Sequence, residues 1–281
     1  MTLTLKRLSA ALVLSVALLP TAHAAQDGDT ERLIRRITPP IQVIEGKIEK
    51  KDHVLVDSFY ETSNVVQGAR TGHWNEITTL FGYTHRNITS YVSNTQFERF
   101  DNKDYTMNIG SYMSFPDSGY AHIETGFGWM VDYLYKFIAI AEYGHRAYKT
   151  LYWQLGYSYR GYASDDVHMI YPGLIYYFGD SYLAADFGIN ITENHDTAYF
   201  GTFKGNCAIT DFLNLWGAIS FGEKLYDIYG FDAHEETGYI LSIGLTYKVY
   251  KDIKLRFGYS YGEEAPKFIK RSVNFAAQVK F

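Results

Sequence analysis

Three polar stretches of the sequence place acidic residues beside histidines or beside one another, the pattern that general-base chemistry requires. They are Asp165-Asp166, His195-Asp196, and the group Asp232, His234, Glu235 and Glu236. A carboxylate or histidine held near water can take its proton, so such groups could act on peptide or lipid. Acidic surface loops without activity have the same composition, and this simpler interpretation is the one we favour.

Motifs of better-defined catalytic chemistry are missing from the sequence. No GxSxG elbow occurs, and no set of cysteine and histidine has the spacing of a structural zinc site. The single cysteine, Cys207, is expected to be an inert small side chain. We therefore expect no catalytic residues, no cofactor and no metal site, with an enzyme at the rim of a membrane protein as the alternative.

The acidic groups lie between segments in which every second residue is apolar. TLYWQLGYSYRGY, for example, places Leu151, Trp153, Leu155, Tyr157 and Tyr159 on one face. About fourteen such segments, each of roughly 10 to 14 residues, follow from residue 52 onward, longer than most soluble strands. Tilted strands that cross a bilayer have this length. The pattern predicts an all-β fold, a closed antiparallel transmembrane barrel of about 14 strands, with 12 or 16 as alternatives.

A soluble β-sandwich also alternates, but its inner faces form a dry core. Here the faces opposite the apolar ones carry Gly, Ser, Thr, Asn and charged residues, which cannot form such a core. The links favour the barrel too, because short ones alternate with longer, more polar ones. The short links are HRN, FPDSG, GHRA, FGDS, ITD and YKD, and the long ones are ETSNVVQGARTGHWN, FDNKDY, YASDD, TENHDT, GEKLYDIYGFDAHEETG and GEEAPKFIKR. Outer-membrane barrels have short periplasmic turns and long outer loops, and an even strand number would leave both termini periplasmic.

The beginning of the chain has the three parts of a secretory signal peptide. Lys6 and Arg7 precede an apolar run, and Ala22-His23-Ala24 resembles a cleavage site. We expect residues 1–24 to be the signal peptide, 25–51 a short periplasmic leader and 52–281 the barrel. The formal charge of −5 and the pI near 6.0 give no basic excess, so no nucleic-acid partner is expected.

The end of the chain, RSVNFAAQVKF, alternates up to its last residue. The apolar positions are Val273, Phe275, Ala277, Val279 and Phe281. We expect this segment to be the closing strand, with these side chains toward lipid and Asn274, Gln278 and Lys280 toward the lumen, because lipid offers no partner to a free strand edge. The same alternation predicts a charged lumen lining: Glu76, His122, Glu124, Lys136, Glu142, Arg160, Asp186, Lys204, Lys248, Lys254 and Arg256. Inward aromatic residues that could stack on sugar rings are Tyr112, Tyr152, Tyr176, Tyr182 and Trp216.

Two resemblances add to this interpretation. The alternation ending in a C-terminal Phe resembles the signal read by the machinery that inserts outer-membrane barrels of Gram-negative bacteria. From VLVDSFYETSN to its end, and best at LGYSYRGYASDDVHMIYPGLIYYFG, the chain looks like the YaiO family of outer-membrane β-barrels. The family implies an outer-membrane location and supplies no established catalytic residues.

The function we expect is that of a passive, porin-like channel or structural surface protein for small hydrophilic solutes, including saccharides. The alternatives are the rim enzyme and a barrel component of polysaccharide export. Expected partners are outer-membrane lipid, lipopolysaccharide and, during biogenesis, the insertion machinery. The oligomeric state and the solute do not follow from the sequence.

Overall fold

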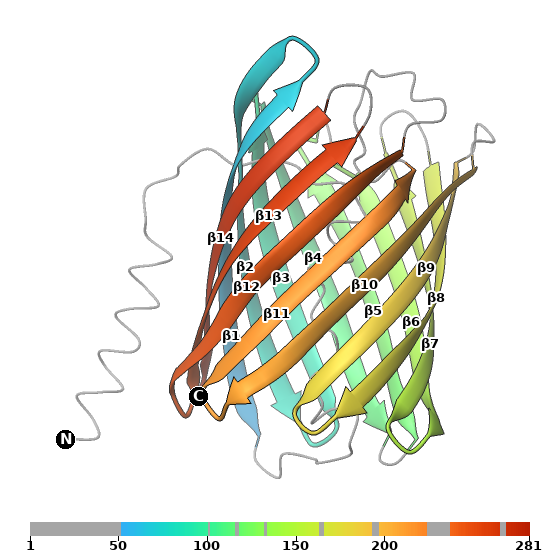
Figure 1. Ribbon diagram of the computed structural model, residues 1–281, viewed down its shortest axis with the longest axis vertical. Helices are drawn as coiled ribbons and strands as arrows, with labels where there is room; N and C mark the ends of the chain where they lie inside the picture. Colours follow the sequence, from blue (N-terminus) through green and yellow to red (C-terminus); the bar gives the residue numbers. More distant parts are fainter. Residues whose placement is uncertain are drawn as a thin grey trace.

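The chain forms one antiparallel sheet closed into a barrel (Figure 1). The computed structural model describes residues 52–100, 102–115, 118–131, 134–162, 166–192, 197–223, 237–264 and 268–281. The strands are β1 (His53–Gln67), β2 (Arg70–His85), β3 (Ile88–Arg99), β4 (Asn102–Phe115), β5 (Gly119–Trp129), β6 (Phe137–Tyr148), β7 (Leu151–Gly161), β8 (Asp166–Phe178), β9 (Ser181–Thr192), β10 (Thr197–Thr210), β11 (Leu213–Glu223), β12 (Thr237–Tyr250), β13 (Ile253–Glu264) and β14 (Phe268–Lys280). Each strand pairs with its neighbours in sequence, and β1 pairs with β14. The prediction of a closed fourteen-stranded barrel is confirmed.

The predicted signal peptide and the leader lie outside the described residues, and the domain boundaries stay predictions. Within the described ranges, no helix has the length and apolar character needed to cross a membrane.

The seam between β1 and β14 includes the last residue of the chain. The backbone N–H of Phe281 donates to the carbonyl of Val54 at 2.9 Å, and the N–H of Val54 donates to the carbonyl of Phe281 at 3.2 Å. The ladder continues without a register shift to Gln67 and Phe268. Both edges of the sheet are thereby paired, as a strand in hydrocarbon requires.

One end of the barrel carries two-residue turns, and Figure 1 shows the C-terminus at this end. Arg86 and Asn87 join β2 to β3, and Gly179 and Asp180 join β8 to β9. The backbone of Gly179 has φ of 60°, a left-handed conformation that costs glycine little. Here Asp52, ahead of β1, lies 3.0 Å from His85 Nδ1, and this hydrogen bond lowers the pKa of the Asp52 carboxyl.

Four of the expected links differ in the structure, and one of them is GEEAPKFIKR, of which residues 262–264 lie in β13 and residues 268–271 in β14. ETSNVVQGARTGHWN is largely strand, since β1 continues to Gln67 and β2 begins at Arg70. The hairpin of β1 and β2 extends beyond the other strands (Figure 1), and its polar sequence stays in the ladder because every second side chain is buried on the inner face. GHRA lies within β6. Most of FDNKDY belongs to β4, and only the two residues between Arg99 and Asn102 remain as the link.

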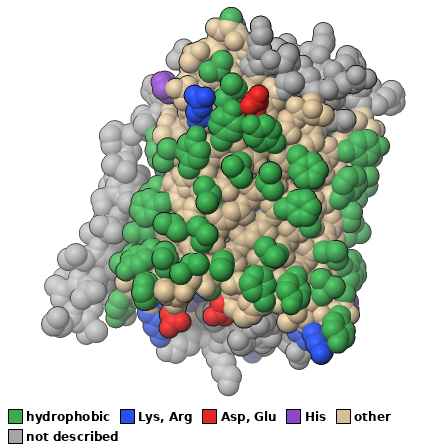
Figure 2. Space-filling model, in the orientation of Figure 1, with side chains coloured by type: hydrophobic (Ala, Val, Ile, Leu, Met, Phe, Trp, Pro, Cys, Tyr) green, Lys and Arg blue, Asp and Glu red, His purple; other side chains and the backbone are tan. Residues whose placement is uncertain are grey.

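The outer surface of the barrel is apolar. Outward-facing Leu241, Ile243 and Leu245 are 50%, 51% and 44% exposed. Figure 2 shows hydrophobic side chains over the face in view, with charged ones near the two ends. Such a surface is stable where lipid tails cover it.

Candidate functional site in the barrel lumen

The charged residues expected to line the lumen differ in exposure. Glu76, Arg160 and Asp186 are buried, Glu124, Glu142, Lys204 and Arg256 are half-buried, and Lys136, Lys248 and Lys254 are exposed. Lys136 lies between β5 and β6 rather than in a strand, and its N–H donates to the carbonyl of Gly161 at 2.7 Å.

The aromatic residues expected inside include one that points outward. Tyr152 is buried, and Tyr112, Tyr182 and Trp216 are half-buried. Tyr176, in contrast, shares the outward face of β8 with Leu174 and is 50% exposed. Its neighbour Tyr177 is the buried residue, so the prediction for Tyr176 is wrong. Tyr176 and Tyr177 are adjacent and identical in type. The alternation of apolar and polar residues therefore does not tell which of the two faces inward.

On β10 to β14, burial of the inward side chains changes along the barrel, whereas on β5 and β7 to β9 the inward side chains at the short-turn end are buried as well: Tyr120, Tyr152, Ile175, Tyr177 and Ala184. On β12, Ile240 near the long-link end is buried, and Lys248 near the short-turn end is exposed. On β10, Phe200 is buried and Asn206 is half-buried. We call the buried, inward-facing residues near the long links the closed half. We call the exposed and half-buried inward residues at the short-turn end the vestibule: Lys204, Asn206, Asn214, Trp216, Thr246, Lys248, Lys254, Arg256, Gln278 and Lys280.

The centre of the closed half is an ion pair between the first and last strands. Lys270 Nζ lies 3.0 Å from Glu61 Oε1, and the two side chains are 2% and 1% exposed. The Lys270 Nζ also lies 5.6 Å from the ring of Trp74, and Arg99 Cζ lies 4.3 Å from that ring. Trp74 is therefore held by two cations, a contact that gains strength away from water.

Hydroxyl pairs and apolar side chains complete the closed half. Three pairs bridge adjacent strands: Ser63 with Ser272 at 3.0 Å, Ser242 with Ser260 at 2.9 Å, and Thr202 with Ser220 at 2.6 Å. The buried apolar cluster there consists of Val65, Trp74, Met169, Tyr171, Phe200, Ala218, Ile240 and Phe268. Hydroxyls that bond one another can be buried at low cost.

A chain of polar contacts runs along the inner face of the sheet from β10 to β5. Lys204 Nζ lies 3.0 Å from Asp186 Oδ2, and Gln154 Nε2 donates to Asp186 Oδ1 at 2.5 Å. The hydroxyl of Tyr120 lies 2.6 Å from Glu142 Oε1 and 2.9 Å from Gln154 Oε1, and its single proton is shared between these two acceptors. The structure thus connects three of the charged residues predicted for the lumen: Lys204, Asp186 and Glu142.

A second polar cluster lies on β3, β4 and β5. The Tyr91 hydroxyl donates to Glu124 Oε2 and lies 2.8 Å from His122 Nε2. Asn108 donates to Glu124 Oε1 at 2.9 Å, and the His122 ring stacks on Tyr112 with centroids 3.9 Å apart. Both oxygens of Glu124 thus accept hydrogen bonds from the wall itself, which indicates a structural role.

In the vestibule, an arginine of β13 binds an acid of β1. Arg256 Nη2 donates to both oxygens of Asp57 at 2.8 and 2.7 Å, and Gln278 Nε2 donates to Asp57 Oδ2 at 3.0 Å. Lys248 and Lys254 are direct cross-strand partners on β12 and β13. The vestibule is consequently rich in positive charge beside β12 to β14.

Inward aromatic rings lie over glycines of adjacent strands. A Cβ at Gly188 would overlap the ring of Phe200, one at Gly156 the ring of Tyr171, and one at Gly244 the ring of Trp216. Glycine is needed at these positions because any side chain would displace the ring.

The five C-terminal positions expected to face lipid vary in exposure. Val273 and Phe281 are 59% and 57% exposed, Phe275 and Ala277 are half-buried, and Val279 is 5% exposed. Phe275 packs on Phe257 of β13, with ring centroids 5.0 Å apart.

Of the acidic rim groups, Asp166 begins β8 and accepts a hydrogen bond from the Tyr159 hydroxyl at 2.8 Å. The others lie outside the described residues: Asp165, His195, Asp196, Asp232, His234, Glu235 and Glu236. In the part of the chain that the structure describes, no group of His, Cys, Asp and Glu could hold a metal ion. Cys207 is exposed and forms no disulfide.

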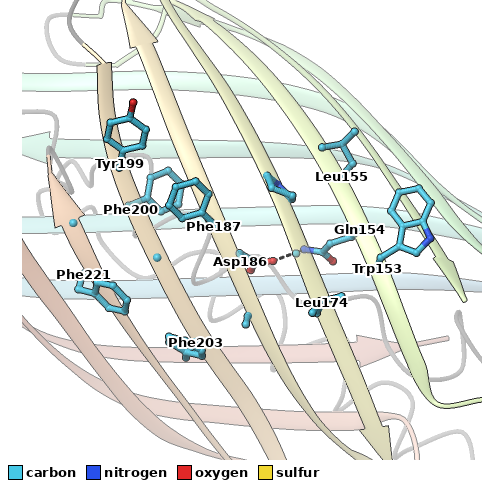
Figure 3. Close-up of a pocket in the computed structure, with 15 residues that line it drawn as sticks. Trp153, Gln154, Leu155, Leu174, Asp186, Phe187, Tyr199, Phe200, Phe203 and Phe221 are labelled. Atoms are coloured by element: carbon cyan, nitrogen blue, oxygen red, sulfur yellow. Dashed lines mark hydrogen bonds between the residues drawn. The ribbon is translucent and has the colours of Figure 1, made fainter. Parts of the chain in front are cut away.

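An apolar hollow lies on the wall between β7 and β11 (Figure 3). The small residues Ala185 and Gly201 leave room between Trp153, Phe187 and Phe203. Because these aromatic side chains face outward, lipid tails are the natural filling of this hollow.

Sequence reasoning missed the residues that fill the closed half. Glu61, Trp74 and Lys270 were assigned to links, and Asp57 of the vestibule was not selected. The available signal was the alternation of Glu61, Ser63 and Val65, which continues the strand.

Taken with its apolar belt and polar lumen, the closed antiparallel sheet defines an outer-membrane β-barrel protein. Residues 60–206 match the family model of the YaiO membrane beta barrel domain, and the chain belongs to this family. The predicted resemblance and the outer-membrane class are confirmed.

Solved barrels show the same fold at low identity. A bacterial polysaccharide outer membrane secretin aligns with TM-score 0.58 and 7% identity over 83% of this chain and 99% of that chain. The Pseudomonas putida toluene transporter TodX aligns with TM-score 0.55 and 8% identity over 92% and 95%. Omp33 of Acinetobacter baumannii aligns with TM-score 0.50 and 12% identity over 82% and 99%. No curated protein matches the chain.

Proposed function

We propose that this protein is a passive outer-membrane channel for small hydrophilic solutes. The observation that carries the proposal is the vestibule, where exposed Lys248 and Lys254 and half-buried Gln278 give the lumen a water-accessible polar lining. A channel for hydrophilic solutes needs a polar lining of this kind, because it replaces part of the water around the solute.

The closed half governs passage. With Trp74 between Arg99 and Lys270, the lumen is packed by side chains near the long links. Solutes pass when these side chains move, so conduction should be small and intermittent. We place the short-turn end and both termini in the periplasm, following the turn pattern of outer-membrane barrels.

A planar-bilayer measurement tests the channel. The purified protein should give discrete, infrequent conductance steps, and Trp74→Ala should increase the open time or the step size because it removes the largest ring of the closed half. Trp129→Ala is the matched control, since Trp129 faces outward on β5 and is 39% exposed. Silence of both the wild type and Trp74→Ala at all voltages would reject the channel.

A further inference from the structure

The outward face of β1 to β3 carries a row of polar side chains, in contrast to the apolar outer surface of β12. Ser58, Thr79 and Asn94 are direct register partners across these three strands. They lie on the outward side, the side of Phe81, which is two residues from Thr79 and 54% exposed. A polar row on this side of a membrane barrel faces the place where lipid tails are expected.

Asn94 lies within the apolar belt rather than at its border. Tyr83, the register partner of Ser90, marks one aromatic border of this face, and Tyr105, the partner of Gln96, marks the other. On β3, Asn94 is about 13 Å from Ser90 and about 7 Å from Gln96, at the usual rise per residue of a strand. At this depth neither water nor lipid tails can hydrogen-bond an amide.

Other outward polar side chains of the wall have partners within the chain. Ser90 and Ser111 share a hydrogen bond at 2.6 Å, and the Thr125 hydroxyl donates to the carbonyl of Ile138 at 3.1 Å. The Asn94 side chain is exposed, and its amide forms no hydrogen bond with any residue that the structure describes. Because an amide without a partner is costly in hydrocarbon, Asn94 needs a partner that lipid does not supply.

The chemistry of this face favours a second copy of the chain as that partner. A primary amide carries both donors and an acceptor, so Asn94 can pair with Asn94 of the partner subunit across a two-fold axis. Charged residues at the two borders of the face are paired within the chain. Lys103 Nζ lies 3.7 Å from Glu98 Oε2, and His85 Nδ1 lies 3.0 Å from Asp52 Oδ2. Two copies can therefore approach each other without strong like-charge repulsion.

From this arrangement we propose that the protein forms a two-fold symmetric dimer in the membrane through the outward face of β1 to β3. Asn94 lies at the centre of the interface, with Ser58 and Thr79 beside it, and apolar Phe81 and Met107 pack around this row. Polar side chains of these types join membrane segments by hydrogen bonds. The inference goes beyond the proposed channel, since each barrel of the dimer keeps its own lumen.

Sedimentation equilibrium of the purified protein in density-matched detergent micelles measures the self-association. The wild type should have the mass of two chains. Asn94→Leu should weaken the association by about ten-fold or more, because both subunits lose the amide. Thr125→Val is the matched control and should leave the association unchanged, since the Thr125 hydroxyl bonds within its own chain. A boiled and an unboiled sample of each variant on a detergent gel check that the barrel is folded.

Photocrosslinking in cells identifies the partner. A photoreactive phenylalanine analogue at Met107, the register partner of Asn94 on β4, should give a product that contains two copies of the chain. The same analogue at Ile243 on β12, which is 51% exposed, is the matched control and should give no such product.

Three results would overturn the dimer. They are a monomeric wild type in micelles, an association that Asn94→Leu leaves unchanged, and equal yields of the two-chain product at Met107 and Ile243. A crosslink from Met107 to a different protein, without a two-chain product, would overturn the second copy as the occupant of this face.

Discussion

Glu61 and Lys270 form a buried ion pair, 3.0 Å between Oε1 and Nζ, that joins the first strand of the barrel to the last. Removing one partner leaves a charge without its counterion in a dry interior. Lys270→Met should therefore lower the free energy of unfolding by about 3 kcal/mol or more. The double variant Glu61→Gln with Lys270→Met should lose less free energy of unfolding than the sum of the losses of the two single variants.

Denaturant titration in micelles, followed by tryptophan fluorescence, measures these differences. Lys251→Met, in an exposed turn, should leave stability unchanged. Strictly additive losses would contradict a direct interaction between Glu61 and Lys270.

The glycines beneath the aromatic rings should not tolerate a methyl group. Gly188→Ala places a Cβ inside the ring of Phe200 and should cost about 1 to 3 kcal/mol, the usual penalty of overpacking. At Gly217 a Cβ meets only the carbonyl oxygen of Ser242, at 3.5 Å. Gly217→Ala should therefore be nearly neutral in the same unfolding titration, and similar losses at both positions would show that the rings can move away.

The position of Phe281 in the seam predicts an assembly defect. Phe281→Ser keeps the backbone pairing with Val54 but removes the aromatic side chain that we expect the insertion machinery to read. The fraction of protein in the heat-modifiable, folded form should fall in cells. Phe281→Tyr should keep most of the folded fraction. A normal yield of folded Phe281→Ser in cells would show that the aromatic side chain is not needed as an insertion signal.

The rim acid Asp166 should be dispensable for chemistry. Its carboxylate accepts a hydrogen bond from the Tyr159 hydroxyl, and this contact gives the side chain a structural role at the start of β8. Asp166→Asn should leave the lipid A composition of cells unchanged in mass spectra. An altered acyl pattern would instead favour an enzyme at the rim.

Much of the fold was accessible from alternation alone, because lipid outside and polar groups inside give each strand two contrasting faces. The fourteen strands were predicted for this reason. The length of the first hairpin was not, since Glu61 and Asn75 look like loop residues until their neighbours in the ladder are known. The ion pair of Glu61 with Lys270 was equally hidden, because it depends on strands that lie at opposite ends of the sequence.

The vestibule illustrates the same limit. Lys248 and Lys254 were expected in the lumen from their own strands, but their register pairing depends on the turn and on the bulge between Lys248 and Tyr250. Alternation along one strand shows which face of the sheet a side chain occupies. Its position along the barrel axis and its cross-strand partner depend on the register between strands.

The closing seam has a consequence for the timing of folding. Ser63 and Ser272, which share a hydrogen bond across it, are 209 residues apart in the chain. One edge of β1 pairs with β2, which follows it directly, but the other edge cannot find its permanent neighbour until β14 has been synthesised and exported. Until then its edge stays open to wrong partners, so the chain depends on being held unfolded and on a late, slow closure. The pairing of Phe281 with Val54 at the short-turn end belongs to this late step.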